Sequence, residues 1–230
     1  MRIVAVDSST EWLSVCACDG HTAIAFRERA GITSSERMLP LVRQALDEAG
    51  WTLAALDGIA YGAGPGSFTG IRIACGVAQG LALGADLPVV GVPTLLALAQ
   101  ACLREHGAQR VLACLDARMR EIYVASYLRE NDVWRLAGGP VVCKPGDLQL
   151  ADPGPWHGAG DGFAAYPQLA AGLGLSAVDC AIVPDAQSIA EIALPRFAAG
   201  EGLPAAQAQP LYVRNRVALT TVERAAGVHL

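Results

Sequence analysis

A glycine-rich loop lies near the middle of the first half of the chain and reads Gly62-Ala63-Gly64-Pro65-Gly66-Ser67-Phe68-Thr69-Gly70-Ile71-Arg72. Apolar residues 59–62 before it predict a buried strand, and residues 69–83 after it predict a helix. Glycines permit tight turns, and free backbone amides at the start of a helix attract anions. The segment therefore predicts a strand–turn–helix unit, either as a purely structural turn or as a place where phosphate approaches the backbone.

This loop matches neither of two well-known enzyme signatures. A P-loop requires G-x-x-x-x-G-K-[ST], but the sole lysine of the chain is Lys144, far from the loop. A hydrolase nucleophile elbow requires G-x-S-x-G, but Pro65 and Thr69 stand where glycines should flank Ser67. The loop motif, without an assigned chemistry, consists of Gly64, Pro65, Gly66, Ser67, Thr69 and Gly70.

The helix after the loop carries small residues at every fourth position along two separate stripes. The two stripes are Gly70, Ala74, Ala78, Ala82 and Gly76, Gly80, Gly84. Glycine inside a helix costs up to about 1 kcal/mol relative to alanine, so packing is expected to offset the three glycines of the second stripe. Packing on the chain's own sheet explains one stripe. The second stripe predicts a close external partner such as another helix, unless the chain itself buries both faces.

The flanking sequence predicts an α/β fold. The expected elements are strands at 2–7, 13–18 and 22–27, a helix at 34–49, a strand at 89–92 and a helix at 94–105. Thr33 and Glu36 fit a capping box at the start of the 34–49 helix, which contains Pro40. The first three strands have the spacing of an antiparallel meander. The alternation that follows implies crossover connections and a parallel portion of sheet.

The pattern then restarts after Gly107. A strand ends in Asp116 as the first strand ends in Asp7, and five residues separate each from the next alternating strand. Aligning Asp7 with Asp116 brings Leu13 onto Ile122. This faint repeat predicts two similar lobes, the second of them looser and closed by a helix with Asp185 as its N-cap. The lobes are expected at residues 1–107 and 108–230, with the final tail packing back on the first lobe.

Composition excludes several classes of protein. The 230 residues carry a net charge of −5, and 53% are hydrophobic against 17% charged, which excludes intrinsic disorder. The acidic balance disfavours a stand-alone nucleic-acid binder. The uncharged run 87–103 contains two prolines and is shorter than the roughly 20 residues of a membrane span. With only four apolar residues before Asp7, no signal peptide is expected, so we predict a cytoplasmic protein without a membrane segment.

Few residues are candidates for catalysis or metal binding. The four histidines are isolated, and the seven cysteines are scattered without a C-x-x-C pair, which favours reduced core thiols over a zinc site. Asp7 and Asp116 each end a strand, where α/β ligand sites commonly form. The turns that follow them contain no glycine to let a phosphate approach. An ATP-dependent phosphotransferase or ATPase using Asp7 and the turn at 158–162 remains the alternative.

Four motifs in order resemble those of one family. They are Asp7-Ser8-Ser9-Thr10, the Gly64-to-Arg72 block, Asp116-Ala117-Arg118-Met119 and Pro210-Leu211-Tyr212-Val213-Arg214. Along nearly its whole length the chain resembles the TsaB (YeaZ) family of the bacterial tRNA threonylcarbamoyladenosine machinery. The resemblance implies a two-lobed actin-like ATPase fold of the sugar kinase and heat-shock protein superfamily, with a duplicated βββαβα core and a degenerate second lobe.

The resemblance also implies a function. Such chains are non-catalytic partners of TsaD, which holds the metal and transfers threonylcarbamoyl to N6 of adenosine 37 in tRNAs reading ANN codons. TsaE joins the larger assembly, tRNA is contacted only through the complex, and a homodimer is expected when the chain is alone. No cofactor is expected to bind tightly to the isolated chain, and ATP or ADP at the TsaD interface stays open.

Residue roles follow from the same resemblance. N-terminal-lobe helices are expected to pack into a bundle with TsaD, which singles out Arg37, Met38, Leu41, Ala45, Ile71, Ala74, Cys75 and Ala78 as partner-binding residues. The degenerate nucleotide site is expected at Asp7, Ser8, Asp116 and Gly160, without catalytic residues or metal ligands. Many relatives carry a histidine just before Glu36, where this chain has Ser34-Ser35, so no role is carried over for that side chain.

Overall fold

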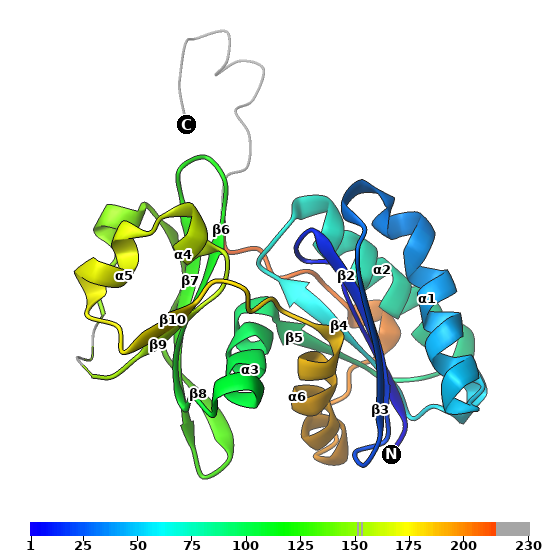
Figure 1. Cartoon of the computed structure of the whole chain (residues 1–230). Helices are drawn as coiled ribbons and strands as arrows, with labels where there is room; N and C mark the ends of the chain where they lie inside the picture. Colours follow the sequence, from blue (N-terminus) through cyan, green and yellow to red (C-terminus); the bar gives the residue numbers. More distant parts are fainter. Residues whose placement is uncertain (151, 153, 215–230) are drawn as a thin grey trace, which may run out of the picture.

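A computed structural model describes residues 1–150, 152 and 154–214, arranged as two lobes that each contain one five-stranded sheet (Figure 1). The first sheet consists of β1 (Ile3–Asp7), β2 (Trp12–Cys18), β3 (Ala23–Arg29), β4 (Gly58–Gly64) and β5 (Val89–Pro93). Their order is β3-β2-β1-β4-β5, with β1, β2 and β3 antiparallel and β4 and β5 parallel to β1. The predicted meander and crossover strands are confirmed.

The second sheet repeats this arrangement. It consists of β6 (Arg110–Asp116), β7 (Ile122–Glu130), β8 (Val133–Cys143), β9 (His157–Ala159) and β10 (Ala177–Asp179). The order β10-β9-β6-β7-β8 is the first order with each strand replaced by its counterpart, and the parallel and antiparallel pairings also match. The predicted internal repeat is therefore confirmed. β9 and β10 have three residues each, which makes the second lobe the more degenerate one.

The predicted alignment of the two repeats is wrong by one residue. Asp7 pairs with Ser14 across the first hairpin, whereas Asp116 pairs with Ile122 across the second. Ile122 thus corresponds to Ser14 and not to Leu13. The reason is that the second turn is one residue shorter, a difference that the alternation of strand residues alone does not reveal.

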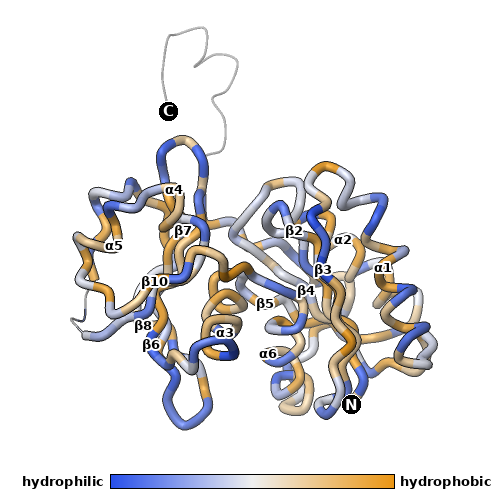
Figure 2. Tube along the Cα trace, in the orientation of Figure 1, coloured by the Kyte–Doolittle hydropathy of each residue, from blue (hydrophilic) through white to orange (hydrophobic). Residues whose placement is uncertain are grey.

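The helices cover both faces of the sheets. Buried apolar residues of α1 (Ser34–Ala49) and α2 (Phe68–Ala85) pack on one face of the first sheet, while α6 (Ala186–Ala198) packs on the other. α3 (Thr94–His106) packs on the second sheet, which α4 (Gly162–Ala165) and α5 (Gln168–Leu173) cover from the opposite side. Apolar and polar residues alternate along α1, as expected for a helix with one buried face (Figure 2).

Two helices pack on the sheet that the other half of the sequence forms. α3 lies in the first half of the chain, yet Leu95, Leu98 and Cys102 belong to the core of the second sheet. α6 lies in the second half, yet Ile189 and Phe197 fill the core of the first sheet. Each sheet is built from one half of the sequence, whereas the core on one face of each sheet contains residues from both halves.

The ends of the helices agree in part with the sequence patterns. Asp185 is the N-cap of α6, because its Oδ1 accepts a hydrogen bond from the Ser188 amide at 2.7 Å. The predicted capping box at α1 is wrong: Thr33 makes no side-chain cap, and its hydroxyl donates instead to the Ala30 carbonyl at 2.9 Å. A short 3-10 turn at Gly31–Thr33 precedes α1 and turns the Thr33 hydroxyl back toward Ala30.

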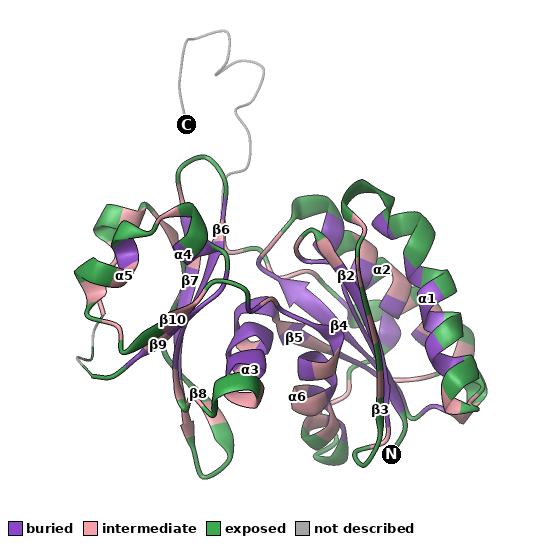
Figure 3. Ribbon diagram, in the orientation of Figure 1, coloured by how far each residue is buried: buried purple, intermediate pink, exposed green. Residues whose placement is uncertain are grey.

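The longest helix, α2, is apolar enough and long enough to cross a membrane by length and composition alone. In this fold it lies on β4, and only a third of its residues are buried. Burial is concentrated in the central strands, while the outer sides of α1 and α5 are exposed (Figure 3). α2 is therefore a sheet-packed helix with a large apolar side left uncovered.

Candidate functional site

The glycine-rich loop closes over the turn that follows β1. The Ser67 amide donates to the Ser9 carbonyl at 2.7 Å, and the Ser8 hydroxyl donates to the Gly70 carbonyl at 2.8 Å. A side chain at Gly66 would overlap the Ser9 carbonyl, and one at Gly70 would overlap the Ser8 carbonyl. The glycines of the motif thus allow two backbones to touch. That contact occupies the place where a phosphate would need to approach the turn.

Asp7 lies beneath this contact and has no exposed surface. Its Oδ2 accepts hydrogen bonds from the Ser9 hydroxyl at 2.9 Å and the Ser9 amide at 3.3 Å. Its Oδ1 is buried against Gly62 without a hydrogen-bond partner among the described residues. Burial raises the pKa of this carboxyl group to about 7, because the charged form loses its hydration. Asp7 is therefore enclosed by the fold and cannot contact a ligand in solvent.

The corresponding turn of the second lobe is more open. The Asp116 carboxylate is 16% exposed and forms an ion pair with Arg118 at 3.0 Å. Its backbone amide donates to Asp161 Oδ1 at 2.9 Å. Gly160 adopts a positive φ of 111° and packs directly against the Cys114 carbonyl. Because Gly160 has no side chain, this turn can pack closely against β6.

Between these two turns lies a cleft of about 770 Å³. Its walls include Ser8 and Asp116 but neither Asp7 nor Gly160, so the structure brings only half of the predicted nucleotide-site residues to one cavity. Residues 211–214 of the C-terminal segment also line it, a contribution that sequence reasoning missed. The shared motif Pro210–Arg214 was the one available signal for that segment. No group of three or more side chains suited to a metal ion occurs within the described ranges.

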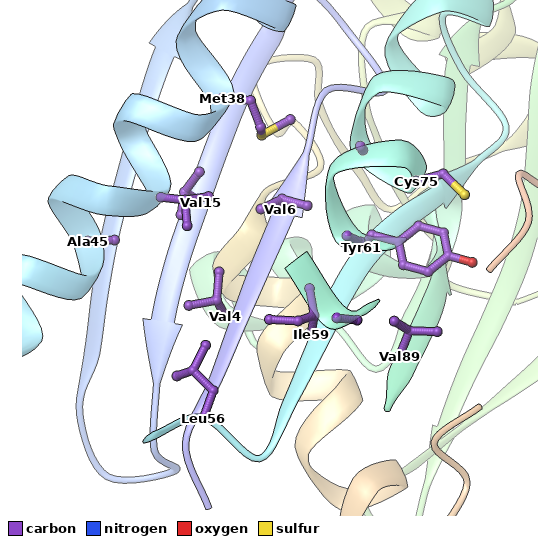
Figure 4. Packing of buried hydrophobic residues seen from close by; sticks show 14 of the residues in the cluster. Val4, Val6, Val15, Met38, Ala45, Leu56, Ile59, Tyr61, Cys75 and Val89 are labelled. Carbon is purple, nitrogen blue, oxygen red and sulfur yellow. The ribbon is translucent and has the colours of Figure 1, made fainter. Parts of the chain in front are cut away.

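Most of the predicted partner-binding residues lie in the hydrophobic core instead of on a surface. Seven of the eight are at most 5% exposed, and they are Met38, Leu41, Ala45, Ile71, Ala74, Cys75 and Ala78. Met38, Ala45 and Cys75 lie among the side chains of the first sheet (Figure 4). The prediction is wrong for these residues in this fold, because they lie on the sides of α1 and α2 that are buried within the same chain.

Only Arg37 of the predicted set is exposed. Its guanidinium donates to both oxygens of Glu28 at 2.7 and 2.9 Å, and this pairing lowers the pKa of Glu28. The pair ties the start of α1 to the edge strand β3. The exposed Arg37 side chain is therefore already paired with Glu28 of its own chain.

The second small-residue stripe of α2 is open. Gly76, Gly80 and Gly84 are exposed, and a methyl group built on any of them would meet no atom within 4 Å. Leu83 on the same side is 72% exposed, and Leu39 on the neighbouring α1 is 52% exposed. We define the α1–α2 face as Leu39, Gly76, Gly80, Leu83 and Gly84. It combines exposed leucines with a helix flank flat enough for a second helix to approach closely.

Comparison with known proteins places the chain in a family. A family model described as "TsaD: tRNA N6-adenosine threonylcarbamoyltransferase" matches residues 28–194. The "tRNA threonylcarbamoyladenosine biosynthesis protein TsaB" of Escherichia coli K12 is 43% identical over 95% of this chain and 96% of its own length. The protein of the same name from Haemophilus influenzae is 37% identical over 94% and 95% of the two chains.

A solved structure agrees with these relatives. YeaZ from Pseudomonas aeruginosa superimposes with a TM-score of 0.85 at 41% identity, covering 92% of this chain and 99% of that one. The match confirms the predicted fold class, a duplicated α/β chain of the two-lobed actin-like ATPase type. Because relatives at 37–43% identity match more than nine-tenths of both chains and a solved structure at 41% identity shares the fold, the chain belongs to the TsaB (YeaZ) family.

Proposed function

We propose that this chain is a non-catalytic subunit that pairs with TsaD in tRNA threonylcarbamoyladenosine biosynthesis. In this role it supports the transfer of threonylcarbamoyl to N6 of adenosine 37 in tRNAs reading ANN codons. Its membership of the TsaB family supports the pathway. The single observation that carries the pairing is the exposed α1–α2 face on an apolar helix of which only a third is buried.

The absence of catalysis is supported by the closed turn after β1. A carboxylate that positions a metal-bound phosphate must be ionised and reachable from the cleft. Asp7 has no exposed surface, and its carboxyl group is enclosed by Gly62 and the Ser9 hydrogen bonds. Ser8 and Ser9 line the cleft, but the glycine-rich loop packs directly on their backbone, so a phosphate could not approach the backbone of this turn closely.

Pairing with TsaD is supported by the relatedness of the two chains. A family model of TsaD matches most of this chain, so TsaD is expected to carry counterparts of α1 and α2. Two related chains can associate through equivalent patches about a pseudo-two-fold axis, as identical chains do in an isologous dimer. The glycine stripe lets helix backbones come close, and the leucines supply apolar area to bury.

The remaining assignments follow from the same proposal. The acidic chain is proposed to reach tRNA only through the complex and to work in the cytoplasm with TsaE in the larger assembly. The isolated chain is proposed to bind no nucleotide tightly. Without TsaD, the uncovered α1–α2 face is proposed to pair with a second copy of the chain, because exposed apolar patches tend to associate.

Co-purification with TsaD tests the pairing. We expect the natural chain to form a stoichiometric complex with TsaD. Gly80→Trp should lower the affinity about tenfold or more, because its indole would project from the α1–α2 face. Gly172→Trp on α5 is the matched control, because it is also an exposed helical glycine with no atom within 4 Å. Ala78→Trp is unsuitable, since Ala78 is fully buried and the change would disrupt the core. Failure of the natural chain to associate with TsaD would refute the proposal.

The alternative function, an ATPase or phosphotransferase, draws on one observation. The cleft of about 770 Å³ has the size of a small-molecule site, and Asp116 lies on its wall. Isothermal titration calorimetry of the isolated chain with ATP and magnesium separates the two functions. Binding tighter than about 10 μM, or roughly −7 kcal/mol, would favour the enzyme.

A further inference from the structure

The C-terminal segment 203–214, which we name the strap, first runs along the lobe that contains β4 and β5. Leu203 pairs with Val89 through two backbone hydrogen bonds of 2.8 and 2.9 Å. The Tyr61 hydroxyl then binds both the amide and the carbonyl of Gln209, at 2.9 and 3.1 Å. The Leu211 amide finally donates to the Ala63 carbonyl at 2.7 Å. Up to Leu211 the strap is thus part of the first lobe.

Beyond Leu211 the strap crosses the cleft at its rim. The Tyr212 hydroxyl accepts a hydrogen bond from Arg72 Nε at 2.8 Å. The Arg72 guanidinium also lies 3.6 Å from the centre of the Phe68 ring, which fixes its orientation. Tyr212 therefore anchors the strap to the start of α2, on the first-lobe side of the cleft.

Two residues later the strap reaches the second lobe. The Arg214 guanidinium donates to Glu121 Oε2 at 2.6 Å and to the Ala117 carbonyl at 3.1 Å, and it lies 5.7 Å from the Tyr123 ring. The Arg214 side chain is only 13% exposed. Charge-assisted hydrogen bonds from a shielded guanidinium are among the stronger polar contacts in proteins. Arg214 is thus bound to the turn between β6 and β7.

We infer that the strap is a lock that sets the separation of the two lobes. The three residues from Tyr212 to Arg214 span at most about 11 Å when fully extended, so their anchors on the two lobes cannot move far apart. A second set of contacts joins the lobes where α3 meets α6, with Arg104 bound to Asp185 at 2.6 Å. The strap runs from one lobe to the other at a place separate from α3 and α6 (Figure 1). The two lobes are therefore joined at two separate places, by the α3–α6 contact and by the strap.

Spin-label distance measurement tests the lock in the full-length chain. One label is placed at the exposed native Cys180 in the second lobe and one at His21→Cys in an exposed turn of the first. Cys143→Ser removes the other partly exposed thiol. Dilution with unlabelled chain removes distances between molecules, so the result is independent of self-association and of TsaD.

We expect a narrow distance distribution for the natural strap, and a broader distribution with a shifted mean for both Arg214→Ala and Glu121→Gln. Arg135→Ala, which breaks an ion pair of 3.3 Å within the second lobe, is the matched control and should leave the distribution unchanged. Circular dichroism verifies that each variant is folded. If Arg214→Ala fails to fold, Glu121→Gln decides alone, since it keeps the size of the side chain. A folded variant with an unchanged distribution would overturn the lock.

Discussion

The Asp7 carboxyl group lies at the end of β1, a position where ligand sites of α/β proteins commonly form, yet it is fully buried. Its burial raises its pKa from an ordinary value of 3.8 to about 7. The folded chain thus holds a proton on Asp7 more tightly than the unfolded chain. The stability that this preference contributes is fully present below about pH 4 and is lost as the pH rises through 7.

Asp7→Asn should remove this pH dependence, because asparagine has the shape of the protonated acid and carries no charge. We expect the variant to match the natural chain near pH 4 and to exceed its free energy of unfolding at pH 8 by about 4 kcal/mol. Urea unfolding at both pH values measures the difference. Asp47→Asn, at a carboxylate 71% exposed on α1, is the control. If the free energy of unfolding changed equally with pH in the natural chain and in Asp7→Asn, the raised pKa of Asp7 would be contradicted.

Replacing a glycine of α2 by alanine should raise the free energy of unfolding at one position and lower it at another. At Gly70 an added methyl group would overlap the Ser8 carbonyl, so Gly70→Ala should cost more than about 2 kcal/mol of folding stability. At Gly76 the space is open, so Gly76→Ala should stabilise the isolated chain by about 0.5–1 kcal/mol. Denaturant unfolding of both variants checks this, and a loss of stability in Gly76→Ala would show that its flank is not open.

At the scale of elements, α2 shows how one helix can serve two purposes. The stripe Gly70–Ala82 lies on the sheet, while the stripe Gly76–Gly84 is exposed on the opposite side. Three glycines on the exposed side weaken the helix without any packing benefit inside the chain. This cost is understandable if the benefit arises between chains, as in the proposed complex with TsaD.

The start of α6 offers a test of how the helices join the lobes. Asp185 accepts the Ser188 amide with one oxygen and binds Arg104 of α3 with the other. Asp185→Ala should cost about 2–3 kcal/mol, because it removes the helix cap and the shortest ion pair of the partly buried Arg104 guanidinium, which keeps only Ser188 and the longer contacts to Glu191 and Glu105. Asp185→Asn retains a capping oxygen and should cost less. Equal costs in thermal unfolding would mean that the cap contributes little.

At the scale of the whole molecule, the two lobes share their hydrophobic cores. Phe197 of α6 is 6% exposed and packs on the first sheet, although it follows the whole second sheet in the sequence. Leu98 of α3 is fully buried on the second sheet, although it precedes that sheet. Such exchange couples the two lobes into one folding unit.

A fragment that ends at residue 107 should therefore fail to fold cooperatively. It lacks α6, so Ile3 and Ala60 on the uncovered face of the first sheet would meet solvent, and the side of α3 that packs on the second sheet would be exposed. Circular dichroism during urea titration should show no sigmoidal transition, in contrast to the full chain. A single cooperative transition of the fragment would show that the first lobe folds alone.

The predictions from the sequence succeeded where the information was local. Alternation and helical spacing located the strands around Asp7 and Asp116 and the helix after the glycine-rich loop. The candidate site was predicted only in part. Ser8 and Asp116 line the cleft as expected, whereas Asp7 and Gly160 do not. The tail was expected to pack on the first lobe, as residues 203–211 do, but its contribution to the cleft was missed. No local pattern signals that residues 211–214 reach the cleft, since their partners lie more than 90 positions away at Ala117 and Glu121.

The order of the elements, their duplication and the family motif were determined by the sequence alone, because periodicity and turn residues act over a few positions. Three features were decided only by the tertiary structure. They are which stripe of α2 faces the sheet, how Asp7 is enclosed, and that α3 packs on the second sheet while α6 packs on the first. Each depends on contacts between distant segments, such as Ser8 with Gly70 and Asp185 with Arg104. Burial is a property of the assembled layers, and an apolar or small residue looks the same in sequence whichever side of a helix is covered.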